Sequence, residues 1–208
     1  MMQKIIPAIL TDNPEDLRKK FGLLRGQSEW VHIDIMDETF VPRASVPIDA
    51  LKEFSGQFLF EAHLMVADPV KYFGACAAAG VHRLVFHLEA ADDPSNTLEA
   101  MGAYGFQRGI AMNPTTPVSA IAPYLALADS VLLLGVEPGA QGNPFIPEVL
   151  QKAIALKGQT TIGVDGGVGK ENILKVFTAG ADYAVVGSAI WQSEHPVEIF
   201  RAMQNMVR

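Results

Sequence analysis

Short runs of apolar residues recur along the whole chain, and a segment with helical spacing follows almost every run. Apolar runs of four to eight residues that alternate with amphipathic segments are typical of parallel β-strands joined by helices. This pattern predicts strands at residues 4–10, 30–36, 59–65, 84–88, 108–112, 130–136, 161–164 and 183–186. Pro7 interrupts the first run, and proline within a run usually argues against a paired strand.

Helices are predicted between these strands from their start and stop signals. Residues 11–15 (TDNPE) supply a capping side chain, a first-turn proline and an acidic first turn, and Gly80 is expected to end a helix that begins at Asp68-Pro69. The predicted helices cover residues 14–24, 48–54, 69–79, 95–104, 116–125, 147–157, 170–178 and 196–207.

Eight strand–helix units in 208 residues predict an α/β fold of the (β/α)8 TIM barrel type, with residues 1–208 forming a single domain. The segments 77–86 and 177–186, in which a predicted helix end is followed by glycine and then by a strand, resemble each other, as expected for tandem units. The alternative is an open doubly wound sheet, but no G-x-G-x-x-G motif follows the first predicted strand.

The composition narrows the possible partners. A formal net charge of −7 argues against nucleic acid, although backbone amides could still bind a small phosphorylated substrate. Cys76 is the single cysteine, so no intrachain disulfide can form. No signal-peptide layout or membrane-spanning apolar run is present. These features predict a cytoplasmic protein with no membrane partner.

The predicted strand at 30–36 carries polar groups on one face. Because side chains alternate along a strand, His32, Asp34 and Met36 point in the same direction. The ends of two other strands offer His63 and Asp165. Since catalytic groups of barrels gather at the carboxyl ends of the strands, this set could hold a divalent cation with nitrogen and oxygen ligands. The alternative is a hydrogen-bonded core or loop histidine, which we favour for the chain's other strand-associated histidines, His82 and His87.

Asp34 and Asp165 have a second possible use. They belong to the second and seventh strands, which are three steps apart in a ring of eight, so they would face each other across the barrel mouth. Two carboxylates on opposite sides of a flat substrate suit proton exchange at one carbon. The alternative is two unrelated polar caps.

Glycine-rich segments end the last three strands, at 135–142, 164–169 and 186–189. Such loops bring bare backbone N–H groups to an anion, and barrels often bind phosphate after strands seven and eight. A single loop of this kind could serve only as a tight turn, but three adjacent loops favour phosphate binding.

Six ordered segments carry a family resemblance: H-I-D-I-M-D-x-x-F-V-P (32–42), A-H-L-M-V (62–66), V-x-P-G (136–139), G-N-P-F-I-P (142–147), V-D-G-G-V (164–168) and V-G-S-A-I (186–190). They resemble ribulose-phosphate 3-epimerase, over nearly the whole chain. The resemblance implies a barrel isomerase of the pentose phosphate pathway that interconverts D-ribulose 5-phosphate and D-xylulose 5-phosphate through an enediolate, using one divalent metal. It also implies a homo-oligomer.

The resemblance assigns roles by matching positions. The implied metal ligands are His32, Asp34, His63 and Asp165, with Asp34 and Asp165 also acting as the acid/base pair. The implied substrate and phosphate contacts are Met36, His63, Met65, Gly139, Gly142, Gly166, Gly167, Gly187 and Ser188. The ligand set suits zinc best, and iron, manganese or cobalt would also fit.

Several positions depart from the family pattern. Ala8 stands where a serine is usual, and Leu134 stands where a sulfur-containing side chain is usual. The rim and the 139–143 loop also differ, at Glu38, Thr39, Arg43, Ala140 and Gln141. These changes leave open a hexulose 6-phosphate substrate such as allulose 6-phosphate, or a non-catalytic sugar-phosphate binder. The retained metal-site residues argue against the binder.

Overall fold

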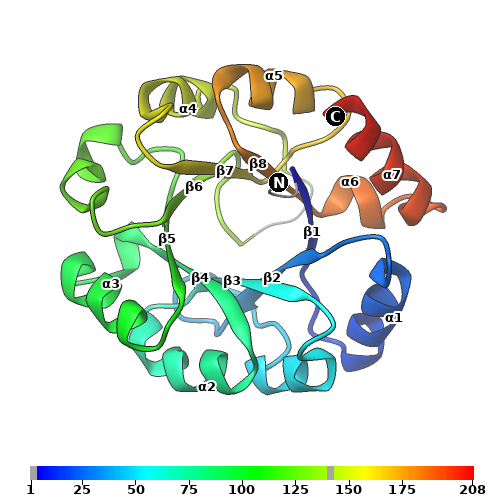
Figure 1. The fold of residues 1–208 in the computed structure, drawn as a ribbon, viewed down its shortest axis with the longest axis horizontal. Coiled ribbons are helices and arrows are strands. Elements are labelled where there is room, and N and C mark those ends of the chain that lie inside the picture. Colours follow the sequence, from blue (N-terminus) through cyan, green and yellow to red (C-terminus); the bar gives the residue numbers. More distant parts are fainter. Residues whose placement is uncertain (1–3, 140–142) are drawn as a thin grey trace.

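Eight parallel strands form a closed barrel in which each strand pairs with its neighbours in chain order, and β8 pairs with β1 (Figure 1). The structure is a computed structural model that describes residues 4–139 and 143–208. The strands are β1 (Ile5–Ile9), β2 (Trp30–Met36), β3 (Leu59–Met65), β4 (Val81–His87), β5 (Gln107–Met112), β6 (Ser130–Leu134), β7 (Thr161–Asp165) and β8 (Tyr183–Val186).

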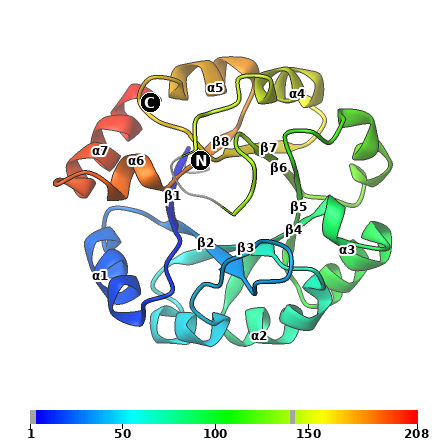
Figure 2. The same cartoon turned by 180° about the vertical axis from the view of Figure 1, so that it is seen from behind.

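Helices surround the barrel on its outside, as the opposite views in Figures 1 and 2 show. They are α1 (Pro14–Leu24), α2 (Phe73–Ala78), α3 (Pro94–Ala103), α4 (Val149–Leu156), α5 (Ile173–Ala179), α6 (Ser188–Trp191) and α7 (Pro196–Met206). Short 3-10 helices occupy Ile48–Phe54, Pro69–Tyr72, Leu88–Ala90, Val118–Ala120 and Ala122–Tyr124. Across the described ranges, no helix combines the length and apolarity needed to cross a membrane.

The predicted barrel is confirmed, and the strand predictions at 30–36, 59–65 and 183–186 match residue for residue. Pro7 lies inside β1 nevertheless. It pairs with Val186 of β8, whereas the pairing of β1 with β2 begins at Ala8. The proline therefore falls where the ladder on the β2 side has not yet started, and its missing N–H removes no bond there.

One element prediction needs correction. The segment 116–125 is not an α-helix but two 3-10 turns, because Pro123 removes an N–H group that a continuous helix would need. The predicted short helix at 48–54 is confirmed, as a 3-10 helix over Ile48–Phe54. Helix α6 (Ser188–Trp191) was not predicted, since four residues carry too little periodicity. Gly80 does end its helix segment, with φ +77°.

The alternation of side chains on β2 decides which residues face the site. Val31, Ile33 and Ile35 face outward and belong to the large core between barrel and helices. Trp30 faces inward with Ile6, Leu132 and the other side chains that fill the barrel interior. The β2–β3 register then aligns His32 with Glu61, Asp34 with His63, and Met36 with Met65. Polar groups from two strands are thereby stacked in matched layers inside the barrel.

Candidate active site

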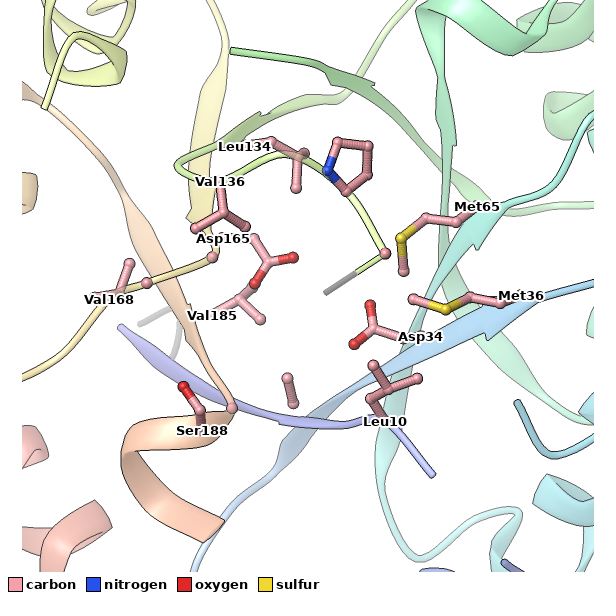
Figure 3. Close-up of a pocket in the computed structure, with 16 residues that line it drawn as sticks. Leu10, Asp34, Met36, Met65, Leu134, Val136, Asp165, Val168, Val185 and Ser188 are labelled. Atoms are coloured by element: carbon pink, nitrogen blue, oxygen red, sulfur yellow. The ribbon is translucent and has the colours of Figure 1, made fainter. Parts of the chain in front are cut away.

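A cavity lies at the carboxyl ends of the strands, and Figure 3 shows the side chains that line it. Asp34, Met36 and Met65 come from β2 and β3, and Asp165 comes from β7 on the other side of the cavity. The two carboxylate groups point toward each other across the space (Figure 3). The predicted opposition of the two aspartates is therefore present in the structure.

Asp34 and Asp165 also belong to the predicted cluster of His32, Asp34, His63 and Asp165, in which one candidate ligand atom from each residue lies within 4.8 Å of all the others. His32 Nε2 lies 3.3 Å from Asp34 Oδ1 and 3.9 Å from Asp165 Oδ2. His63 Nδ1 lies 3.2 Å and 3.8 Å from the same two oxygens. Ligands about 2.1 Å from a tetrahedral ion are separated by about 3.4 Å, so two nitrogens and two oxygens at these spacings fit one divalent cation.

Buried side chains orient both histidines from behind. His32 Nδ1 lies 2.6 Å from Glu61 Oε1, and Glu61 Oε2 accepts hydrogen bonds from Arg83 (2.6 Å) and Tyr183 (2.9 Å). On the other side, His63 Nε2 lies 2.9 Å from His87 Nε2. Each histidine therefore uses one ring nitrogen toward buried protein and turns the other toward the cluster.

Sequence reasoning did not identify Glu61, Arg83 and Tyr183, although a signal was present for the first of these. Glu61 lies two residues before His63, so both side chains share the inward face of β3, just as His32 and Asp34 share that of β2. A glutamate in an apolar strand marks the same kind of site. The interpretation of His87 as a hydrogen-bonded core side chain is borne out, since it is fully buried and bonded.

The electrostatics of the cluster shift the pKa values of the two aspartates in opposite directions. Burial opposes ionisation of Asp34, but hydrogen bonds with His32 and His63 outweigh it and lower the pKa of this carboxyl. Burial, together with the charges of Asp34 and Glu61, raises the pKa of Asp165 to about 7. A pair of carboxyl groups with displaced pKa values is the arrangement that separates a base from an acid.

The pKa values of the buried histidines are shifted as well. Burial disfavours protonation of His32, but its contacts with Asp34 and Glu61 dominate and raise its pKa. Burial lowers the pKa of His63, and it lowers that of His87 to about 4. Glu61 stays ionised, because its bonds to His32 and Arg83 overcome burial and lower its pKa to about 2.

The glycine-rich strand ends lie together on one side of the cavity. Gly139, Gly166, Gly167, Gly187 and Ser188 all line it, whereas Gly142, Ala140 and Gln141 lie outside the described residues. Gly166 and Gly167 adopt φ of +92° and +67°, and a Cβ on Gly167 would lie 2.9 Å from the backbone of Phe145. Glycine is thus required there by conformation and close packing, and the same bare backbone borders the cavity.

The positions that depart from the family pattern fall into two groups. Ala8 and Leu134 line the cavity wall directly. Glu38, Thr39 and Arg43 lie in the exposed segment after β2, where Glu38 is the single non-glycine residue with positive φ, +65°, among the residues described. Met36, Met65 and Val41 form a small apolar cluster at the mouth.

Two comparisons with solved structures support the fold. The chain is similar to a 3-hexulose-6-phosphate synthase (TM-score 0.78, 18% identity, covering 97% of this chain and 98% of the other). It is also similar to an orotidine 5'-phosphate decarboxylase from Pyrococcus horikoshii (TM-score 0.70, 18% identity, 98% and 99%).

Comparisons with sequences are more specific. The chain is 32% identical to ribulose-phosphate 3-epimerase of Schizosaccharomyces pombe over 98% of this chain and 93% of the relative. It is 32% identical to the Mycobacterium tuberculosis enzyme (96% and 91%), and 33% identical to the cytoplasmic isoform of Oryza sativa (98% and 94%). The model of the ribulose-phosphate 3 epimerase family matches residues 4–191. The chain therefore belongs to the ribulose-phosphate 3-epimerase family of isomerases.

Proposed function

We propose that this chain inverts carbon 3 of a ketose phosphate, converting D-ribulose 5-phosphate to D-xylulose 5-phosphate by proton exchange between two aspartates. The observation that carries the proposal is the placement of Asp34 and Asp165 on opposite sides of one cavity, with their pKa values displaced in opposite directions. A planar intermediate held between them would present one face to each carboxyl group.

His32, Asp34, His63 and Asp165 would hold the divalent cation, and their spacing supports this assignment. When bound, the cation supplies Lewis-acid stabilisation for negative charge that develops on the substrate oxygens. Zinc suits two nitrogen and two oxygen donors best, while iron, manganese and cobalt also accept this set.

The two aspartates would divide the proton transfers. Asp34, whose lowered pKa keeps it ionised, would remove the C3 proton from one face, leaving an enediolate. Asp165, whose raised pKa makes it the more basic of the two carboxyl groups, would deliver a proton to the opposite face. In the reverse reaction the two roles exchange. Met36 and Met65 would pack against the sugar carbons and exclude water from this space.

The phosphate would bind on the side of β7 and β8. Gly166 and Gly167 follow β7, Gly187 and Ser188 follow β8, and all four line the cavity. Gly139 borders it from the β6 side, and the family pattern adds Gly142. Backbone N–H groups and one hydroxyl would bind the phosphate, since none of the described residues that line this cavity is Lys or Arg.

NMR of ribulose 5-phosphate in deuterated water, with protein and added Zn²⁺ or Mn²⁺, tests the proposal. We expect deuterium at C3 and the appearance of xylulose 5-phosphate. Asp34→Asn and Asp165→Asn should each abolish inversion while leaving the protein folded. Metal-loaded, folded protein that exchanges no C3 hydrogen would overturn the pentulose assignment.

A hexulose 6-phosphate such as allulose 6-phosphate is a second candidate substrate, favoured by the small side chain of Ala8 in the cavity wall. Comparing kcat/KM for pentulose and hexulose phosphates decides between them. The single domain over residues 1–208, self-association and a cytoplasmic location stay predictions.

A further inference from the structure

A charged group lies at the centre of the barrel, below the candidate metal cluster. The Glu61 side chain is fully buried, and the side chain of its partner Arg83 is 5% exposed. Burying an ion pair is costly, and replacing such a pair with well-packed apolar residues is often neutral or stabilising. Stability alone is therefore a weak reason for charged residues at these two positions.

The contacts of Glu61 give a different reason. Its Oε1 atom lies 2.6 Å from His32 Nδ1, while its Oε2 atom accepts hydrogen bonds from Arg83 and Tyr183. Both carboxylate oxygens are thus occupied, and the carboxylate cannot rotate without breaking a bond. A fixed carboxylate at Nδ1 keeps the proton on that nitrogen, which leaves His32 Nε2 to face the cluster.

Arg83 is itself held in place. Its guanidinium lies 4.6 Å from the ring centre of Trp30 and 4.9 Å from that of Tyr183, and its Nε donates to Gln107 (3.2 Å). These contacts come from β2, β8 and β5, so three other strands of the barrel hold Arg83 on β4. Through its hydrogen bond, Arg83 in turn holds Glu61. The orientation of His32 is therefore set by the barrel rather than by the cluster.

The charges lead to the same conclusion. Glu61 and Arg83 balance each other, which leaves the two negative charges of Asp34 and Asp165 to be matched by one divalent cation. If Arg83 were present without Glu61, its positive charge would oppose cation binding from below. Glu61 thus also shields the cluster from Arg83.

We propose that Glu61 is a positioning residue, held by Arg83 and Tyr183, that fixes His32 with Nε2 toward the metal site and so determines metal affinity. The proposal rests on the metal assignment made above. It does not involve contact between Glu61 and substrate.

The main test is the double variant Glu61→Gln/Arg83→Met, which removes both buried charges together and so avoids an unpaired guanidinium. Chelator-competition titration with Zn²⁺ and Co²⁺ measures affinity directly, without any activity assay. We expect affinity to fall about 10–100-fold, as for other groups that orient metal ligands. Tyr183→Phe keeps the carboxylate and its contact with His32, so its loss should be smaller.

The control is Glu53→Gln, which breaks the exposed ion pair with Arg18 and should leave affinity unchanged. Proton NMR provides a second measurement. The His32 Nδ1–H resonance should be shifted downfield and protected from exchange in the wild type, and should move upfield in the double variant. If Glu61 only stabilised the fold, the double variant would have a lower thermal stability but unchanged metal affinity and an unchanged His32 Nδ1–H resonance.

A folded double variant with wild-type metal affinity and an unmoved Nδ1–H resonance would overturn the proposal. If the wild type bound no divalent cation, the metal assignment would fail instead. The resonance in the metal-free protein would then still decide whether Glu61 positions His32.

Discussion

Replacing Gly163 with alanine is expected to destabilise the protein through a side chain on the neighbouring strand. Gly163 is buried on β7 and pairs in register with Tyr183 of β8. An added Cβ would lie 2.4 Å from Tyr183 Cζ and 2.6 Å from its hydroxyl oxygen. Since carbon atoms pack at about 3.5–4.0 Å, the ring would have to move by more than 1 Å.

That movement has two costs. Overpacking a core in this way costs about 1–3 kcal/mol. The Tyr183 hydroxyl also donates to Glu61 at 2.9 Å, and a displaced ring would lose this bond to a charged acceptor, worth about 1.5–3 kcal/mol. Because the two effects overlap, we expect Gly163→Ala to lower the free energy of unfolding by about 2–5 kcal/mol.

Urea denaturation followed by tryptophan fluorescence measures this difference. The matched control is Gly22→Ala on the exposed surface of α1, where an added Cβ meets no atom within 4 Å. That substitution should stabilise the protein by about 0.5–1 kcal/mol, because alanine loses less backbone entropy in a helix. If Gly163→Ala were as stable as the wild type to within about 0.5 kcal/mol, the rigid placement of Tyr183 would be refuted.

Three further predictions concern other parts of the chain. Glu38→Gly should raise the free energy of unfolding by about 1 kcal/mol, because Glu38 has φ +65°, and a loss of stability would contradict this. Because burial raises the pKa of Asp165 to about 7, the metal-free carboxyl is protonated at pH 6 and must ionise to bind a cation. Calorimetry in buffers of different ionisation enthalpy should therefore detect more protons released on Zn²⁺ binding at pH 6 than at pH 8, and equal release would count against the raised pKa. Burial also raises the pKa of Cys76 to about 12, so its thiol should react with a disulfide reagent only after unfolding; rapid reaction of the native protein would show otherwise.

Local patterns in the sequence were enough to predict the strands and part of the site. The period of two along residues 30–36 assigned His32 and Asp34 to one face, because alternation in a strand depends on backbone geometry alone. Local patterns were less reliable where a segment with helical spacing contained a proline in its interior. The helical spacing of 116–125 concealed the effect of Pro123, which lacks the N–H that a continuous helix needs at that position, so that the structure has two 3-10 turns there.

The sequence by itself determined the eight strand–helix units, the inward direction of the metal-site residues and the glycine-rich ends of the last three strands. Only the tertiary structure decided which group faces the second nitrogen of His32. Glu61 is 29 residues away from His32, and Tyr183 is 122 residues away from Glu61. These groups meet because the β2–β3 register pairs His32 with Glu61 and because barrel closure brings β8 round to the same interior. Register and closure follow from the packing of the whole barrel, which no local period encodes.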